Sequence, residues 1–173
     1  IRGLAKEKRN LNFVPIDQIH LTLRFLGANV TEPSRDLLIE TFKKYEGQYS
    51  KPTIKINSLQ LGFDYQNDPR VIFSMVLEDS GLTELAKEIH GILKMLRLRD
   101  TIRWKEKKSL DFHFSIARLK GYAGKNIGKQ VNNSVNKIHL PFPASYTPET
   151  FEIVKSKITG GAPLYKKLFS VKL

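Results

Sequence analysis

The chain has 173 residues, of which 40% are hydrophobic and 27% are charged, a composition typical of a globular domain. It contains no cysteine, which excludes disulfides and thiolate metal sites, and no apolar run approaches the roughly 20 residues that span a bilayer. The formal net charge of +12 favours a polyanionic partner such as RNA. We expect a single soluble, cytoplasmic domain over 1–173, without a membrane partner; the sequence leaves the oligomeric state open.

Periodic patterns predict four elements in the first half of the chain. They are a strand over 19–26, a helix over 31–45, and a hairpin of strands over 53–63 and 71–77. The first strand alternates apolar and polar side chains up to Gly27. Thr31 as a cap, with Pro33 in the first turn, marks the start of the helix.

The second half continues the mixture of helices and strands. The expected elements are a helix over 82–98, a strand over 112–119, a short helix within 121–136, and strands over 138–143, 151–158 and 164–173. An apolar stripe from Leu82 to Leu96 carries the longer helix. Strands linked by hairpins and mixed with helices predict an α+β fold with largely antiparallel sheets.

Two tetrads inside predicted strands have the same pattern: histidine, apolar residue, hydroxyl, apolar residue. They begin at His20 and at His113. Because residues two apart in a strand share a face, His20 lies beside Thr22, and His113 lies beside Ser115. If the two strands are neighbours, both imidazoles and both hydroxyls converge on one cleft.

Such a cleft suits phosphodiester cleavage. One imidazole takes a proton from the attacking oxygen and the other gives one to the leaving oxygen, while hydroxyls bind the phosphoryl oxygens. Arg24, on the same predicted face as His20, adds positive charge. Strict alternation places Arg118 on the face opposite His113 unless the strand bulges or ends there, so Arg118 is a weaker candidate for a phosphate contact.

Residues 19–27 and 112–118 resemble the two His-x-Thr-x motifs of the 2H phosphoesterase superfamily, in particular the RNA 2′,3′-cyclic phosphodiesterase family, also called 2′-5′ RNA ligase or LigT-like. The resemblance runs from about Leu11 to the C-terminus, where residues 154–165 are similar to that family's closing hairpin. It implies a bilobal, pseudo-twofold fold of two largely antiparallel sheets with outer helices around a central cleft. We expect the family's first strand to be missing before Ile1.

The resemblance also implies an activity and residue roles. The activity is metal-independent hydrolysis of RNA 2′,3′-cyclic phosphate ends to 2′-phosphates, with 2′-5′ ligation as the reverse reaction. His20 and His113 would form the acid/base pair, with Thr22, Ser115 and Arg118 on the phosphate. The family favours His20 as the acid and His113 as the base; the residues alone leave this open.

Two positions depart from the family pattern. Ser115 stands where threonine is commoner, a change that keeps the hydroxyl. Phe112 stands where a proline often precedes the second histidine, which alters how the strand enters the site.

A basic stretch precedes the second tetrad. Trp104 could stack on a base while the surrounding cations meet phosphates. These cations are Arg103, Lys105, Lys107 and Lys108. The alternative is a solvated basic loop with a half-buried tryptophan. His90 and His139 lie outside both tetrads and are interpreted as structural or solvated.

The remaining patterns limit the alternatives. The acidic residues show no metal-ligand spacing, and no glycine-rich phosphate loop occurs, so we expect neither a metal nor another cofactor. One rival is a sister 2H phosphodiesterase acting on small cyclic nucleotides or 2′-5′ oligoadenylate. Another is a non-catalytic RNA-binding module, and the presence of both histidines favours an enzyme over that module.

Overall fold

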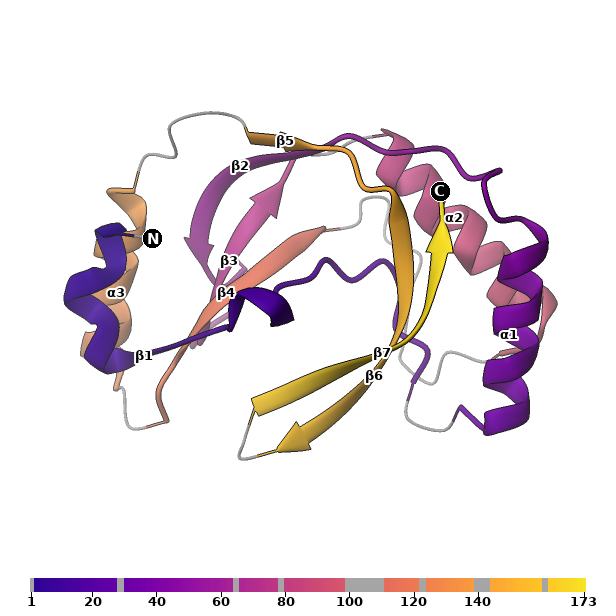
Figure 1. Ribbon diagram of the computed structural model, residues 1–173. Helices are drawn as coiled ribbons and strands as arrows, with labels where there is room; N and C mark the ends of the chain where they lie inside the picture. Colours follow the sequence, from indigo (N-terminus) through magenta and orange to yellow (C-terminus); the bar gives the residue numbers. More distant parts are fainter. Residues whose placement is uncertain are drawn as a thin grey trace. The chain divides into compact units, whose positions relative to one another are not determined.

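The computed structural model describes residues 2–27, 30–63, 66–77, 80–98, 111–121, 124–138, 144–159 and 162–173 (Figure 1). Contacts within the chain divide it into two compact units. Unit 1 comprises Ile1–Thr22, Lys55–Leu77 and Asp111–Ser145, and unit 2 comprises Leu23–Ile54, Glu78–Leu110 and Tyr146–Leu173. Each unit has a hydrophobic core of its own.

Unit 1 is built on a five-stranded sheet with the order β1-β4-β3-β2-β5. In that order the strands are Leu11–Phe13, His113–Leu119, Val71–Val76, Ile54–Leu61 and Ala144–Tyr146. The pairs β1–β4, β4–β3 and β3–β2 are antiparallel. Strand β4 therefore lies inside the sheet, with a hydrogen-bonded neighbour on each side.

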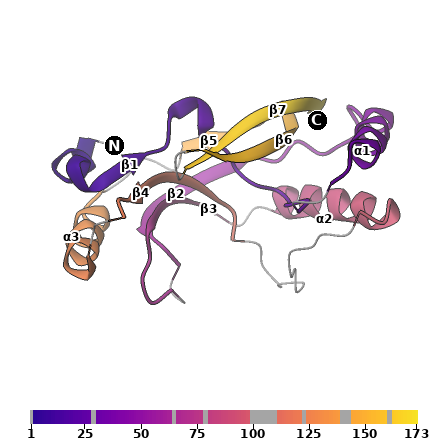
Figure 2. The same cartoon turned by 90° about the horizontal axis from the view of Figure 1, so that it is seen from below.

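Two helices cover the apolar face of this sheet. The 3-10 helix η1, Arg2–Asn10, lies beside α3, Lys125–Asn136, in both views (Figures 1 and 2). Side chains three apart in a 3-10 helix line up, and the aligned Leu4, Glu7 and Asn10 are all buried. The Glu7 carboxylate accepts hydrogen bonds from Asn10, Gln130 and Ser134, so the buried charge is satisfied where η1 meets α3.

Strand β4 contains a β-bulge. Its partners on β3 run regularly from Met75 opposite His113 to Phe73 opposite Ser115, but the next β3 residue, Ile72, faces Ala117. Ile116 is thus the extra residue. Because a bulge sends two successive side chains to the same face, Ile116 and Ala117 are both buried in the core of unit 1.

Unit 2 packs two helices against a hairpin. Helices α1, Glu32–Lys44, and α2, Ser80–Met95, share a core with β6, Thr150–Thr159, and β7, Ala162–Lys172. The Phe151 ring makes edge contacts with Phe42 and Tyr49, each at 5.2 Å between centroids. Burial raises the pKa of Tyr49 to about 12. Lys51 donates to Glu149 at 2.6 Å and lowers the pKa of that exposed carboxyl.

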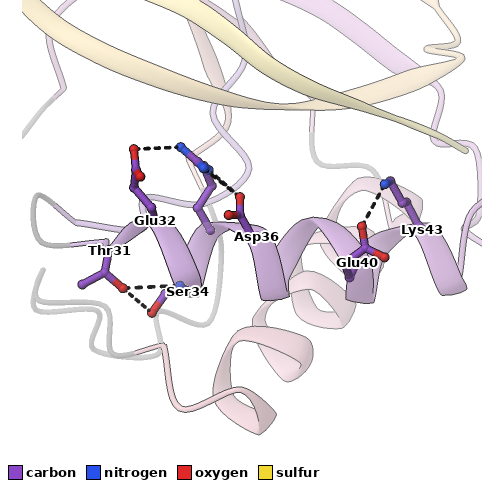
Figure 3. Close-up of polar contacts among 7 residues, drawn as sticks. Thr31, Glu32, Ser34, Asp36, Glu40 and Lys43 are labelled. Carbon is purple, nitrogen blue, oxygen red and sulfur yellow. Dashed lines mark hydrogen bonds and ion pairs between the residues drawn. The ribbon is translucent and has the colours of Figure 1, made fainter.

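The start of α1 follows its sequence signals. Thr31 accepts a hydrogen bond from the backbone N–H of Ser34, and Pro33 lies in the first turn (Figure 3). Along the exposed side, Arg35 pairs with Glu32 and Asp36, and Lys43 pairs with Glu40. The Arg35 guanidinium holds the pKa of Asp36 below its usual range. Such exposed pairs add little stability, so α1 depends on its cap and apolar face.

The structure confirms most of the predicted elements. The helices over 31–45 and 82–98, the hairpin over 53–63 and 71–77, and the strands over 112–119, 151–158 and 164–173 all form, with small shifts at their ends. A helix also forms within 121–136. No sequence pattern predicted η1, whose residues are mostly charged, or the short strand β1. Apart from Ile138, which is not in a strand, the predicted strand over 138–143 lies outside the described residues.

The strand expected over 19–26 is wrong. Only Leu21 forms a β-bridge, to Phe114, and the chain bends at Leu23. Apolar and polar residues alternate beyond Thr22, but the apolar residues belong to two different cores. Ile19 packs against the core of unit 1, whereas Leu23 packs against the core of unit 2. None of the helices in the described ranges is long and apolar enough to cross a membrane.

Candidate active site

The bridge between Leu21 and Phe114 brings the two histidine motifs side by side. In this antiparallel register, His20 lies opposite Ser115 and Thr22 lies opposite His113. Ile19 and Phe114 pack against the core of unit 1, so His20, Thr22, His113 and Ser115 project from the other face of the sheet. All four are half-buried and all belong to unit 1. The structure therefore joins the two pairs of histidine and hydroxyl within one compact unit.

The two histidines are diagonal neighbours across the bridge. In regular antiparallel pairs, Cα atoms in this relation are about 7–8 Å apart. Each hydroxyl stands directly opposite the histidine of the other motif.

Both imidazoles make the same backbone contact. Nδ1 of His20 is 2.9 Å from the carbonyl oxygen of Gln18, and Nδ1 of His113 is 2.7 Å from the carbonyl oxygen of Asp111. A carbonyl oxygen can only accept, so in each ring Nδ1 carries a hydrogen and donates it. In the neutral ring, Nε2 then holds the lone pair. Both rings are thus oriented with Nε2 as the atom that can take up or release a proton.

Aromatic rings flank the second histidine. The His113 ring lies 4.3 Å from the Phe73 ring and 5.2 Å from the Phe63 ring, both in edge contacts. Phe73 comes from β3 and is buried, and Phe63 follows the end of β2. Gly62 has a φ of +69°, and a Cβ there would collide with Pro69, so this turn requires glycine. The turn places Phe63 beside His113.

The bulge in β4 decides the position of Arg118. Counting from His113 and Ser115, strict alternation would send Arg118 to the core side; the extra residue Ile116 reverses this. Arg118 is half-buried and lies opposite Asn12, whereas Leu119 is buried in the core. Arg118 therefore projects from the same face as both histidines. The adjacent apolar residues Ile116 and Ala117 break the alternation and are the sequence signal that could have revealed the bulge.

The other predicted site residues are placed differently. Arg24 follows the bend at Leu23 and belongs to unit 2, so the strand face on which it was expected beside His20 does not exist. The basic stretch of Arg103, Trp104, Lys105, Lys107 and Lys108 lies outside the described residues, as does His139. His90 is half-buried on α2 in unit 2.

Sequence reasoning missed four contributors to this site. They are the carbonyl groups of Gln18 and Asp111 and the rings of Phe73 and Phe63. Every residue has a backbone carbonyl group, so the residue type at a position does not indicate that its carbonyl is an acceptor. Within the described part of the chain, no cluster of three or more His, Cys, Asp or Glu side chains is arranged to hold a metal ion.

Several solved structures share this fold. TT0787 of Thermus thermophilus matches with a TM-score of 0.69 and 23% sequence identity, over 98% of this chain and 85% of that chain. LigT of E. coli, solved with ATP, matches with a TM-score of 0.63 and 18% identity, over 99% and 87%. The chain has the fold of LigT. A structure described as a phosphoesterase also matches, with a TM-score of 0.62 and 18% identity over 93% and 80%.

The LigT-like fold confirms the α+β architecture with antiparallel sheets that the resemblance to the 2H phosphoesterase superfamily implied. No protein-family model matches the sequence. At these identities the likeness concerns the fold alone.

Proposed function

We propose that this protein hydrolyses RNA 2′,3′-cyclic phosphate ends to 2′-phosphates, with two histidines as acid and base. One observation carries the proposal. His20 and His113 stand on one face across a single β-bridge, each with Nδ1 bonded to the carbonyl two residues earlier. A pair of structural histidines has no need of matched orientation, whereas proton transfer by Nε2 on both sides of a phosphate requires it.

In this mechanism one neutral imidazole takes a proton from water as the water oxygen attacks phosphorus. The other imidazole, protonated, gives its proton to the 3′-oxygen as the bond between phosphorus and that oxygen breaks. The product is a 2′-phosphate and a free 3′-hydroxyl. With the 5′-hydroxyl of a second RNA end in place of water, the same proton transfers form a 2′-5′ linkage, which is ligation. The family resemblance favours His20 as the acid and His113 as the base.

Three side chains around the histidines would bind the phosphate. The hydroxyls of Thr22 and Ser115 can donate to the equatorial phosphoryl oxygens, on which negative charge increases during attack. Arg118, returned to the same face by the bulge, supplies a permanent positive charge. Proton transfer and hydrogen bonding of this kind need no Lewis acid, and so the proposed reaction needs no metal.

The nucleotides bound by the structural neighbours support a nucleotide-like substrate. E. coli LigT has been solved with ATP, with NADP+ and with 3′-AMP. The ligand 3′-AMP is a nucleotide with phosphate on the ribose edge on which a 2′,3′-cyclic phosphate lies. The net charge of +12 favours RNA over a small neutral substrate.

The decisive experiment is incubation with an RNA oligonucleotide that ends in a 2′,3′-cyclic phosphate, with and without EDTA, followed by identification of the product. We expect a 2′-phosphate at equal rates in both samples, and a bell-shaped pH profile for kcat/KM. A 3′-phosphate product would contradict the proposed regiochemistry, and loss of activity in EDTA would contradict the metal-free mechanism. Activity on cyclic mononucleotides or 2′-5′ oligoadenylate alone would favour the sister activity, and binding without turnover would favour a non-catalytic RNA-binding module.

A further inference from the structure

The hairpin of unit 2 leaves its core halfway along. In β6, Phe151 and Ile153 are buried, whereas every residue from Val154 to Thr159 is exposed. A register shift between Ile153 and Val154 marks this change. Figure 1 shows the paired strands continuing beyond it as a two-stranded ribbon. We call residues 154–159 and 162–168 the distal ribbon.

One face of the distal ribbon carries three lysines. Lys155 lies directly opposite Lys166, and Lys157, two residues further along, projects from the same face. The sequence from 154 to 168 contains no aspartate or glutamate. Among the residues that the structure describes, none of these three lysines forms an ion pair; the neighbouring Lys167 does, with Glu152.

This arrangement is unfavourable for the isolated protein. Like charges directly opposite each other destabilise an antiparallel pair, and the distal ribbon has no core of its own to compensate. A polyanion would turn the repulsion into attraction by placing phosphates among the ammonium groups. Residues two apart on a strand are roughly 7 Å apart, comparable to the distance between successive phosphates of an extended single strand.

We propose that Lys155, Lys157 and Lys166 form a binding surface for the phosphate backbone of single-stranded RNA. The proposal rests on the proposed function for its choice of RNA and adds a contact that is separate from the histidines. Lysine ammonium groups act as point charges on phosphates, so the surface holds the chain of the RNA substrate without reading its sequence.

The test compares two triple variants with the same change of charge. One is K155Q/K157Q/K166Q. The control, K6Q/K8Q/K129Q, removes three exposed lysines from η1 and α3. Binding of a fluorescent single-stranded RNA with an ordinary 3′-hydroxyl is measured by anisotropy across a salt series. We expect the ribbon variant to bind at least tenfold more weakly at low salt, with a log–log salt slope smaller by up to about 2, because each lost phosphate contact on a single strand removes about 0.7.

The control should lose much less affinity, and K155R/K157R/K166R should bind like the wild type. The melting temperature of the ribbon variant should not fall, because the substituted side chains are exposed and their removal relieves repulsion between like charges. Equal losses in the two glutamine variants would show that total charge matters and would overturn the proposal. The proposal would also be overturned if the ribbon variant bound RNA with wild-type affinity. Binding to phosphatidylserine vesicles is measured beside it, and a ribbon variant that lost vesicle binding but kept RNA binding would overturn the proposal as well.

The outcome is separable from that of the proposed function. Hydrolysis of a cyclic mononucleotide should be unchanged in the ribbon variant. If the wild type proves inactive on every cyclic phosphate but loses RNA binding through the ribbon substitutions, the proposed function fails and this inference stands. If the wild type is active and the ribbon substitutions leave RNA binding intact, the proposed function stands and this inference fails.

Discussion

The two histidine motifs have nearly the same sequence pattern but very different supports. His113 begins strand β4, which has hydrogen-bonded neighbours on both sides, and its ring packs against Phe73 and Phe63. His20 follows the short 3-10 helix η2, Ile16–Gln18, and is tied to the sheet next to a single bridge at Leu21. The same imidazole orientation is nevertheless reached in both. Orientation of the ring thus depends on a local carbonyl contact and not on membership of a strand.

The two histidines should give the largest losses of activity. We expect His20→Ala and His113→Ala each to lower kcat on a cyclic phosphate end by at least about 10²-fold, because general acid and general base contributions are of that size. The double variant should lose far less than 10⁴-fold in kcat, because the effects of substituting two groups that act in one step are not additive. Circular dichroism should show folded protein in each case. A variant with near-full activity would remove that histidine from the mechanism.

Substitution of Arg118 tests whether the positive charge that the bulge places on this face contributes to catalysis. A charge-assisted hydrogen bond contributes about 1.5–3 kcal/mol, so Arg118→Gln should lower kcat/KM by roughly 10- to 100-fold. Arg118→Lys should recover part of this, because it keeps the charge and loses the planar fork. The matched control is Arg9→Gln on η1, an exposed arginine, which should change the rate little. Equal effects of the two glutamine variants would place Arg118 outside the site.

The hydroxyls should show smaller losses that are similar in the two motifs. A hydrogen bond from a neutral hydroxyl to a charged phosphate contributes about 1.5 kcal/mol, at the low end for charged partners, so Thr22→Val and Ser115→Ala should each reduce kcat about tenfold. Steady-state kinetics on the cyclic phosphate substrate measure both. Ser115→Thr should keep most of the activity because it retains the hydroxyl. A loss as large as that of the histidine variants would mean that a hydroxyl also has a chemical role.

The smallest expected effect is on dynamics. Among the described residues, one β-bridge joins the segment 20–22 to the sheet, and such a segment opens more readily than a strand inside the sheet. Amides of residues 20–22 should therefore exchange with deuterium on the order of tenfold faster than those of residues 114–117. Hydrogen exchange with mass spectrometry can resolve the two segments in the free protein. Equal protection would show that the first motif has support beyond the bridge at Leu21.

The sequence predicted those parts of the molecule that depend on local chemistry. The Thr31 cap and Pro33 marked the start of α1, and the apolar stripe of α2 identified that helix, because both signals act within one or two turns. The strand over 19–26 failed because alternation records burial of every second residue and not the presence of a partner strand. Beyond Leu23 the buried residues belong to another core.

The site was predictable in its residue types and less so in its geometry. Two tetrads with histidine and hydroxyl two apart predicted that His20 shares a face with Thr22 and that His113 shares one with Ser115. The bridge between Leu21 and Phe114, which brings the two pairs together, is not contained in any local pattern. The position of Arg118 depended on one extra residue in β4, which shows only as two adjacent apolar residues. The contact between His113 and Phe73 depends on the register between β3 and β4, which no local pattern contains.

The acceptors behind the imidazoles have a consequence for evolution. Gln18 and Asp111 hold the rings through their carbonyl oxygens, which every amino acid possesses. Substituting either residue leaves this acceptor in place, so the contact by itself requires no particular residue type at either position. What selection has to preserve is the course of the chain two residues before each histidine. Insertions or deletions there should be far rarer among functional descendants than substitutions.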